Sequence, residues 1–285
     1  MTRLVLCADD AGLAGPLSRR IASLLASGRL TATSLLACGP AFGEAVEALR
    51  AARVSEAGVH LCVVGGETPL SPRASVASLA PSGRFPEAWP AVAARVAAGL
   101  VRLSEVEREW EAQLAAVREA GFRLTHLDSH QHLHLLPRLV PVAIALARRF
   151  DVPFVRAPRA DDPAAFGAPV GTGGRSRARL LALFGGAARR RIAAAGLPEP
   201  PRVLGLAEAG RMTRARWRSL LERLPREGTF EAVLHPGASD AEASARYPWG
   251  YSWEAESEAL EDGELGRLFA ERGIEAVPFP ALGRR

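Results

Sequence analysis

The chain has 285 residues, of which 48% are hydrophobic, so it can bury a full core as one large α/β domain or two smaller ones. Its formal net charge is +5, but the arginines that carry it are scattered among acidic residues, and we expect no nucleic-acid partner. No apolar run reaches the ~18 residues of a transmembrane helix, and the apolar N-terminal stretch is too short for a signal peptide, which predicts a cytoplasmic protein. Cys7, Cys38 and Cys62 each lie in an apolar run and are expected to be reduced thiols.

Short runs typical of strands alternate with helical patterns in the first half of the chain. Strands are predicted at residues 3–8, 31–37, 58–63 and 123–128, and helices at residues 16–27 and 42–52. Residues 65–90 are rich in Gly, Pro and Ser, which predicts an inserted loop. A further helix is predicted from Ser104, because Ser104 and Glu107 have the spacing of a capping box.

The second half repeats this alternation. Further strands are predicted at residues 153–156 and near 202–206, 230–234 and 274–278, with helices at 138–150, after Thr213 and near 254–271. Residues 161–174 are a second insert rich in Gly and Pro. Because both inserts follow strands, they are expected to shape a substrate cleft rather than to support the core.

Seven or eight β/α repeats in one chain predict a parallel sheet. The segment ADDAGLAG after the first strand offers carboxylates where the dinucleotide site of an open Rossmann sheet needs bare backbone. We therefore predict an α/β fold with a single (β/α) barrel of seven or eight parallel strands. No internal repeat or low-complexity linker divides the sequence, so residues 1–285 are expected to form one domain.

Titratable or cationic residues stand at the ends of five predicted strands. In a barrel these ends converge on the face that carries active sites. A single histidine in an apolar strand is typical of a core residue, and two aspartates after a strand are typical of a helix cap, so only the joint arrangement favours a site. The residues are Asp9, Asp10, His60, Asp128, His130, Arg156 and His235.

Carboxylate and imidazole groups without a thiolate suit a hard or borderline divalent ion. One Asp and two His would leave open positions for water and substrate, which is the pattern of a hydrolytic metal site. Of the adjacent Asp9 and Asp10, one carboxylate would then bind the ion, and the other would stay free to take a proton from the attacking water.

The segments CADDAGL, GVHLCV, THLDSHQHLHLLP and VLHPG, in this order, resemble the YdjC/ChbG family of carbohydrate deacetylases. The resemblance extends over nearly the whole chain and includes YPWGYSWEAESEAL and RGIEAVPF. It implies a deacetylase-type (β/α) barrel that removes acetyl groups from N-acetylated sugars such as chitooligosaccharides. One branch of the family acts in hopanoid glycolipid synthesis.

The resemblance also implies roles for individual residues. Asp10, His60 and His130 match the ligands of one divalent ion, usually magnesium, with zinc as a second choice. Asp9 matches the general base, His235 an acid or transition-state stabiliser, and Arg156 a substrate contact. The family commonly reads Asp-Asp-Phe-Gly where Ala11 stands here, which predicts a wider pocket wall. His126, Asp128, His132 and His134 remain without a role.

We expect a metal-dependent hydrolase that deacetylates an N-acetylated sugar or glycolipid, with Trp249 and Trp253 as a stacking wall for a sugar ring. One rival is a barrel-type phosphoesterase, which usually needs a second metal and more carboxylates. The other is a non-catalytic sugar- or metal-binding protein, which would keep the pocket but could lose the base. A homodimer is compatible with the sequence.

Overall fold

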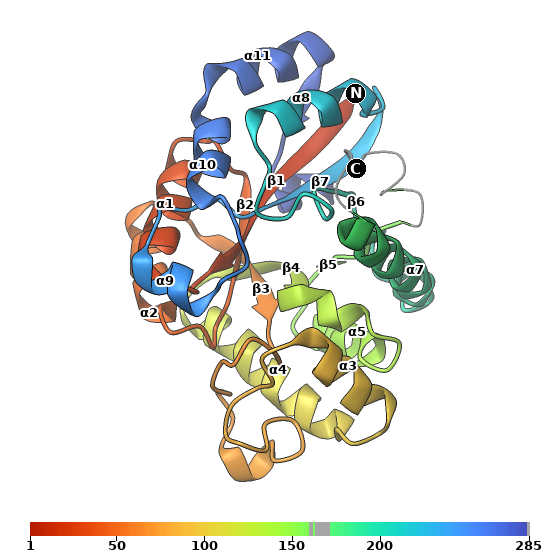
Figure 1. Cartoon of the computed structure of the whole chain (residues 1–285). Coiled ribbons are helices and arrows are strands. Elements are labelled where there is room, and N and C mark those ends of the chain that lie inside the picture. The colour runs from red at the N-terminus through yellow and green to blue at the C-terminus, as the bar shows by residue number, and fades with distance from the viewer. Residues whose placement is uncertain (160–161, 163–171, 284–285) are drawn as a thin grey trace.

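The structure is a computed structural model that describes residues 1–159, 162 and 172–283 (Figure 1). Its centre is a parallel sheet in the order β5-β4-β3-β2-β1-β7-β6, with β8 paired to β1. The strands are β1 (Thr2–Ala11), β2 (Ala32–Leu35), β3 (Glu56–Leu61), β4 (Arg123–Ser129), β5 (Phe154–Val155), β6 (Arg202–Leu204), β7 (Gly228–Leu234) and β8 (Ile274–Ala276).

β1 is an interior strand of this sheet and its longest, at ten residues. One edge pairs with β7 from Thr2 to Ala8, while the other pairs first with β8 and then with β2. Because side chains alternate along a strand, Leu4 and Leu6 pack into the main core, whereas Val5 and Cys7 join a separate small cluster with Phe279. Asp9 has the same parity as Val5 and Cys7, so it continues their row toward the carboxyl end of the sheet.

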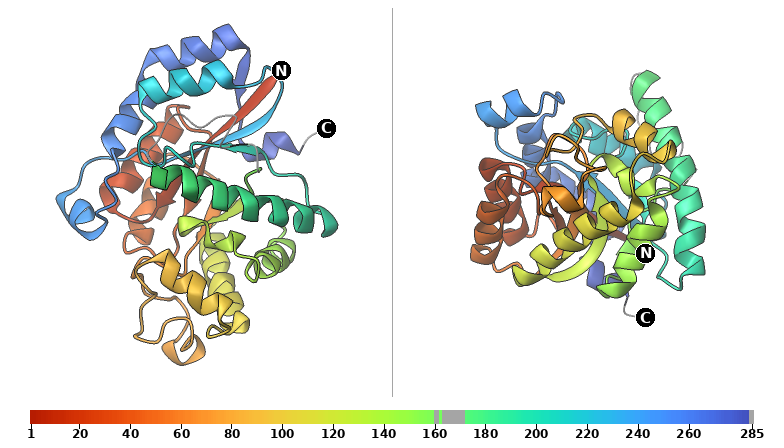
Figure 2. Two further views of the ribbon diagram at one scale, coloured as in Figure 1. Left: turned by 45° about the vertical axis from the view of Figure 1, so that its right-hand side comes forward. Right: turned by 90° about the horizontal axis from the view of Figure 1, so that it is seen from below.

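Helices surround the sheet, with α7 as a long rod along one side (Figure 2). They are α1 (Gly15–Ala26), α2 (Phe42–Ala51), α3 (Trp89–Ala97), α4 (Leu103–Glu119), α5 (Val140–Arg149), α7 (Thr172–Ala194), α8 (Arg214–Arg223), α9 (Ala241–Arg246), α10 (Trp253–Glu261), α11 (Gly263–Arg272) and α12 (Phe279–Leu282), with 3-10 turns η1 (Arg73–Ser75) and η2 (His130–Leu135). Within the described residues, no helix combines the length and the apolar character needed to cross a membrane.

The sheet is curled as the predicted barrel requires, and the strands are parallel. In the described part of the chain β5 and β6 are the two edge strands and do not pair with each other, so the barrel is open. The two edge strands have only two and three residues, which leaves little backbone for a closing ladder. The barrel-type fold is confirmed.

Two predictions of helix ends were wrong. α4 begins at Leu103, and its N-cap Arg102 makes no side-chain capping bond, so Ser104 does not cap it. The carboxylate of Glu105 instead accepts hydrogen bonds from the backbone N–H of Ser78 and Leu79 in the first insert. The single helix expected near residues 254–271 is two helices, because Asp262 ends α10 and caps α11 through the N–H of Glu264.

The first insert, residues 65–90, supports the core, contrary to the prediction. Its Val76, Leu79 and Phe85 are buried in the main hydrophobic cluster. The buried carboxylate of Glu109 on α4 accepts hydrogen bonds from two backbone N–H groups of the same insert. Of the second insert, residues 161 and 163–171 lie outside the described residues.

Candidate active site

Three of the predicted metal ligands meet at the carboxyl end of the sheet. The Oδ1 atom of Asp10 lies 3.2 Å from Nε2 of His60 and 3.0 Å from Nδ1 of His130. The two imidazole nitrogens are 3.4 Å apart. All three side chains are buried and come from β1, β3 and the start of η2. The structure therefore brings together residues that are up to 120 positions apart in the chain.

The backbone turns sharply where these ligands stand. Asp10 has φ 66°, a left-handed conformation that Asp tolerates better than most residues. A Cβ atom on Gly12 would lie 2.7 Å from the carbonyl oxygen of Leu36, so only glycine allows the turn after Asp10 to pack against β2. Gln131 and His132 are also left-handed, directly after His130. Such conformations often accompany functional sites.

The donor set fits one divalent ion. Nitrogen and oxygen ligands at about 2.0–2.1 Å from an ion, at tetrahedral or octahedral angles, lie about 3.0–3.4 Å from one another. The three measured separations are 3.2, 3.0 and 3.4 Å. Burial alone would raise the pKa of Asp10, but the neighbouring His130 and His60 hold it well below its usual range, so the carboxylate is ionised.

A second layer of residues orients His60. The Nδ1 atom of His60 lies 3.0 Å from Oδ1 of Asp128, and the hydroxyl of Ser34 donates to the same carboxylate at 3.0 Å. A carboxylate behind a metal-binding imidazole fixes its tautomer and leaves Nε2 for the ion. Asp128, for which the sequence predicted no role, therefore orients His60. Ser34, which holds Asp128, was not among the predicted site residues.

Asp9 lies beside the ligand cluster and is held by a buried arginine. Arg156 donates from Nη1 to Oδ2 of Asp9 at 2.6 Å and from Nη2 to Oδ1 at 2.8 Å. Its Nη1 also contacts Asp128 at 2.7 Å, and its Nη2 contacts Glu231 at 2.6 Å. Burial raises the pKa of Asp9, and the charge of Arg156 opposes that rise. The result is a carboxylate that is fixed in place yet adjoins the cavity.

The ligand cluster and Asp9 line a cavity of about 260 Å³. His235, directly after β7, also lines it, and its backbone N–H donates to the buried Glu256 at 2.6 Å. Among the described residues, Nδ1 of His235 has no hydrogen-bond partner. The remaining lining residues are Ser129, Gln131, His132, Ala209, Trp249 and Tyr251.

Two predicted substrate contacts lie elsewhere. Arg156 is buried beneath the cavity, with a side chain 1% exposed and a guanidinium that is already shared among carboxylates. Trp253 is in the hydrophobic core, where it packs against Gly237. Trp249 does line the cavity, and Tyr251 provides a second aromatic ring, 5.3 Å from that of Trp249. The alternating aromatic residues of YPWGYSW are the sequence signal that would have included Tyr251.

The unassigned histidines have different surroundings. His134 contacts the hydroxyl of Ser129 and the carbonyl of Arg156, and burial lowers its pKa to about 4. His126 is stacked on Phe279 in the barrel interior, and burial lowers its pKa to about 3. Both are therefore neutral structural groups near pH 7. His132 lines the cavity.

The chain is similar to several known proteins. A carbohydrate deacetylase of Geobacillus stearothermophilus is 26% identical over 273 residues, covering 95% of this chain and 94% of that protein. A carbohydrate deacetylase of Oceanobacillus iheyensis is 32% identical over 154 residues, which cover 53% of this chain but only 63% of that protein. A solved structure from Enterococcus faecalis V583, described as that of a candidate cellobiose-phosphate cleavage protein, has a TM-score of 0.75 at 26% identity and covers 99% of both chains.

The family assignment follows from the extent of the match. The sequence model of the YdjC-like protein family covers residues 3–271, which include the ligand cluster, Asp9 and His235. The chain belongs to the YdjC-like protein family.

Proposed function

We propose that the protein is a metal-dependent hydrolase that removes the acetyl group from an N-acetylated sugar. The observation that carries this proposal is the juxtaposition of Asp10, His60 and His130 with a separate, arginine-held Asp9 at one cavity. The names of the related carbohydrate deacetylases support the same substrate class. Trp249 and Tyr251 offer the aromatic faces on which sugar rings stack.

Asp10, His60 and His130 would hold the ion, which we propose to be magnesium or zinc. When bound, such an ion polarises the acetamide carbonyl and lowers the pKa of water. Asp128 contacts Nδ1 of His60, so Nε2 is the nitrogen that would face the ion.

Asp9 would take the proton from the attacking water. Arg156 holds both of its oxygens and keeps the carboxylate oriented toward the cavity. His235 lines the same cavity and would donate a proton to the amine nitrogen as the carbon–nitrogen bond breaks. The products are then acetate and a free amino sugar. Arg156 is thereby a positioning residue rather than a substrate contact.

A two-metal phosphoesterase is the less favoured function. A second cluster that could hold an ion, Asp9 with His60 and Asp128, adjoins the first. However, Nη1 of Arg156 lies 2.6 Å from Asp9 and 2.7 Å from Asp128, so a cationic group already neutralises those carboxylates. The charge of Arg156 therefore favours a site with one metal ion over a site with two.

The test is acetate release from a panel of N-acetylglucosamine monomers, oligomers and glycolipids, with purified protein that is metal-free or reloaded with magnesium or zinc. We expect metal-dependent acetate release with at least one member, and the panel would also separate free from lipid-linked sugars. Release of phosphate from phosphomonoesters without any acetate release would instead support the phosphoesterase. Sugar binding without turnover in every metal form would support a non-catalytic protein.

A further inference from the structure

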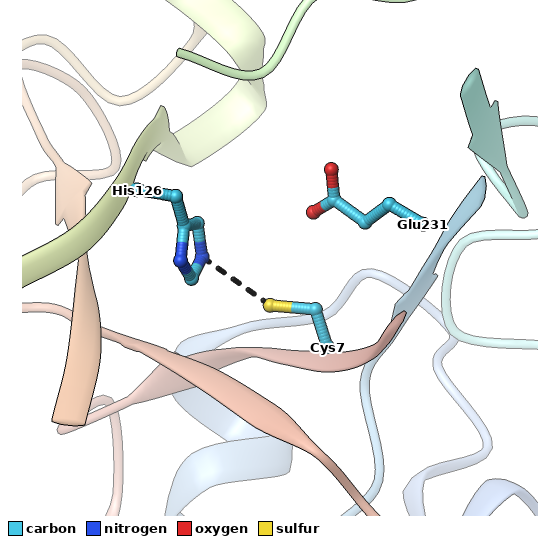
Figure 3. Close-up of side chains that lie close together, drawn as sticks. All are labelled: Cys7, His126 and Glu231. Carbon is cyan, nitrogen blue, oxygen red and sulfur yellow. Dashed lines mark hydrogen bonds between the residues drawn. The ribbon is translucent and has the colours of Figure 1, made fainter. Parts of the chain in front are cut away.

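A compact cluster of polar side chains lies in the barrel interior, one layer below Asp9. Cys7 on β1, His126 on β4 and Glu231 on β7 are all at most 1% exposed and point toward one another (Figure 3). Cys7 Sγ lies 3.4 Å from Nε2 of His126, and one ligand-type atom of each residue lies within 4.8 Å of the other two. Cys7 is two residues before Asp9, and His126 two before Asp128, so the cluster lies directly behind the candidate active site.

This cluster is not arranged as a second metal site. The guanidinium of Arg156 is the cation that faces it, with Nη2 3.6 Å from Cys7 Sγ and 2.6 Å from Glu231 Oε1. An added divalent ion would lie against that positive charge. Burial also raises the pKa of the Cys7 thiol well above its ordinary value, which keeps it protonated and a poor ligand.

Glu231 holds the end of Arg156 that Asp9 leaves free. Its Oε1 accepts from Nε at 2.7 Å and contacts Nη2 at 2.6 Å, while the two Nη atoms face Asp9. A planar guanidinium that is bound by carboxylates along two of its edges cannot rotate without breaking one of the two pairs of hydrogen bonds. Without Glu231, Nε would have no carboxylate, and the guanidinium could turn toward Asp128.

The stability of the fold does not explain Glu231. The two negative charges of Asp9 and Asp128 already exceed the single positive charge of Arg156. Glu231 is a third buried carboxylate, and its desolvation lowers the stability of the fold. In addition, Oε2 of Glu231 has no hydrogen-bond partner among the described residues. A buried polar atom without a hydrogen bond lowers the stability of the fold, and such atoms are expected mainly at functional sites.

We infer that Glu231 is a positioning residue, which fixes the plane of Arg156 and through it the orientation of Asp9. This inference rests on the proposed role of Asp9 as general base. Glu231 touches no reacting atom, and it would act on turnover rather than on the binding of substrate or metal.

The test compares Glu231→Leu, which removes the acceptor at similar size, with Glu231→Gln, which keeps an acceptor for Nε. For Glu231→Leu we expect kcat to fall about 10- to 100-fold, as when residues behind active-site groups are replaced, with KM and metal content unchanged. Glu231→Gln should stay within about threefold of the wild-type kcat, since one hydrogen-bond acceptor replaces another. Neither variant should have a lower melting temperature. A crystal structure of Glu231→Leu should show Arg156 turned away from at least one oxygen of Asp9.

Glu109→Gln is the matched control, because Glu109 is also a buried carboxylate but contacts the first insert and Gln113 instead of the candidate active site. It should lower the melting temperature and leave kcat unchanged. The inference is overturned if Glu231→Leu keeps the wild-type kcat, if it fails to fold or loses metal, or if Glu231→Gln is as impaired as Glu231→Leu. Zinc titration that finds a second ion dependent on Cys7 would also overturn it. A wild-type protein inactive on every N-acetyl sugar contradicts the proposed function instead, and the position of Arg156 in the Glu231→Leu crystal structure still tests the contact.

Discussion

Two adjacent aspartates at the end of β1 have opposite surroundings. Asp9 points to the guanidinium of Arg156, whereas the left-handed backbone of Asp10 directs its carboxylate to His60 and His130. Burial raises the pKa of Asp9, while for Asp10 the imidazoles outweigh burial and lower it. Two adjacent residues of one type therefore have different electrostatic environments, which suits the proposed base and the proposed metal ligand.

Substitution with asparagine should separate these roles experimentally. Asp9→Asn preserves shape and should retain metal, but kcat should fall by about 10²–10⁴, the usual contribution of a positioned base. Asp10→Asn replaces an anionic ligand with a neutral one, so metal affinity should fall first and activity should recover partly with excess metal. Metal analysis after dialysis, together with kcat at rising metal concentration, checks both. Recovery of Asp9→Asn alone would mean that the two roles are reversed.

The pKa of Glu231 gives a prediction for stability. Burial raises it from 4.5 to about 7, against the opposing charge of Arg156. Between these two values the folded state binds a proton that the unfolded state has lost, so this residue's contribution to stability falls as pH rises through that window. Glu231→Gln removes the effect. Its melting temperature relative to the wild type should therefore be higher at pH 8 than at pH 5, and an unchanged difference would show that Glu231 does not titrate there.

At the scale of single elements, the first insert is tied to α4 by buried carboxylates. Glu109 accepts from the backbone N–H groups of Leu70 and Ser71 and from the side chain of Gln113, while Glu105 accepts from Ser78 and Leu79. The insert thereby becomes part of the core instead of a mobile surface loop.

Glu109→Ala should therefore destabilise the protein. It leaves the buried backbone donor of Ser71 without an acceptor, which costs about 1–3 kcal/mol, and the part-buried donor of Leu70 as well. Urea unfolding should show a lower midpoint, while kcat per folded, metal-loaded molecule stays near the wild-type value. If stability were unchanged, water would have to replace the carboxylate, and the insert would behave as the independent loop that its composition predicts.

The sequence predicted strands and their ends well, because apolar runs and the polar residues that follow them are local features. It placed Asp10, His60 and His130 through the resemblance of short motifs. It placed Arg156 at a strand end but could not show its buried role, because its partners Asp9 and Glu231 are 147 and 75 residues away. Gln131 and His132 have left-handed backbone conformations, which the sequence did not predict because neither residue is a glycine. The buried partners of Arg156 were thus beyond prediction, whereas the meeting of polar residues at the strand ends was not.

At the scale of the whole molecule, the first insert and the C-terminal segment are joined beside the cavity. Glu67 accepts from the hydroxyl of Tyr247 at 2.8 Å and pairs with Arg246 at 2.8 Å. The Tyr247 ring then packs at 4.9 Å from that of Trp249, which lines the cavity. Parts of the chain 180 residues apart thereby fix one aromatic wall.

Tyr247→Phe should loosen this wall without touching the ligand cluster. The lost hydrogen bond, about 0.5–1.5 kcal/mol, should raise KM for the N-acetyl sugar by about two- to tenfold with little change in kcat. Steady-state kinetics with a preferred substrate measures both. Glu67→Gln, which keeps an acceptor for the hydroxyl, should change KM less, and a fall in kcat alone would contradict a role in binding.

The position of β1 also bears on how the chain folds. Its partner β7 lies at residues 228–234 and β8 at residues 274–276, so one whole edge of β1 stays unpaired until the far end of the chain is available. Pairing of strands so distant in sequence is slow, and unpaired edges invite aggregation. On the ribosome, β1 to β4 are therefore exposed for most of synthesis, and the protein should refold slowly and benefit from chaperones that shield open strands.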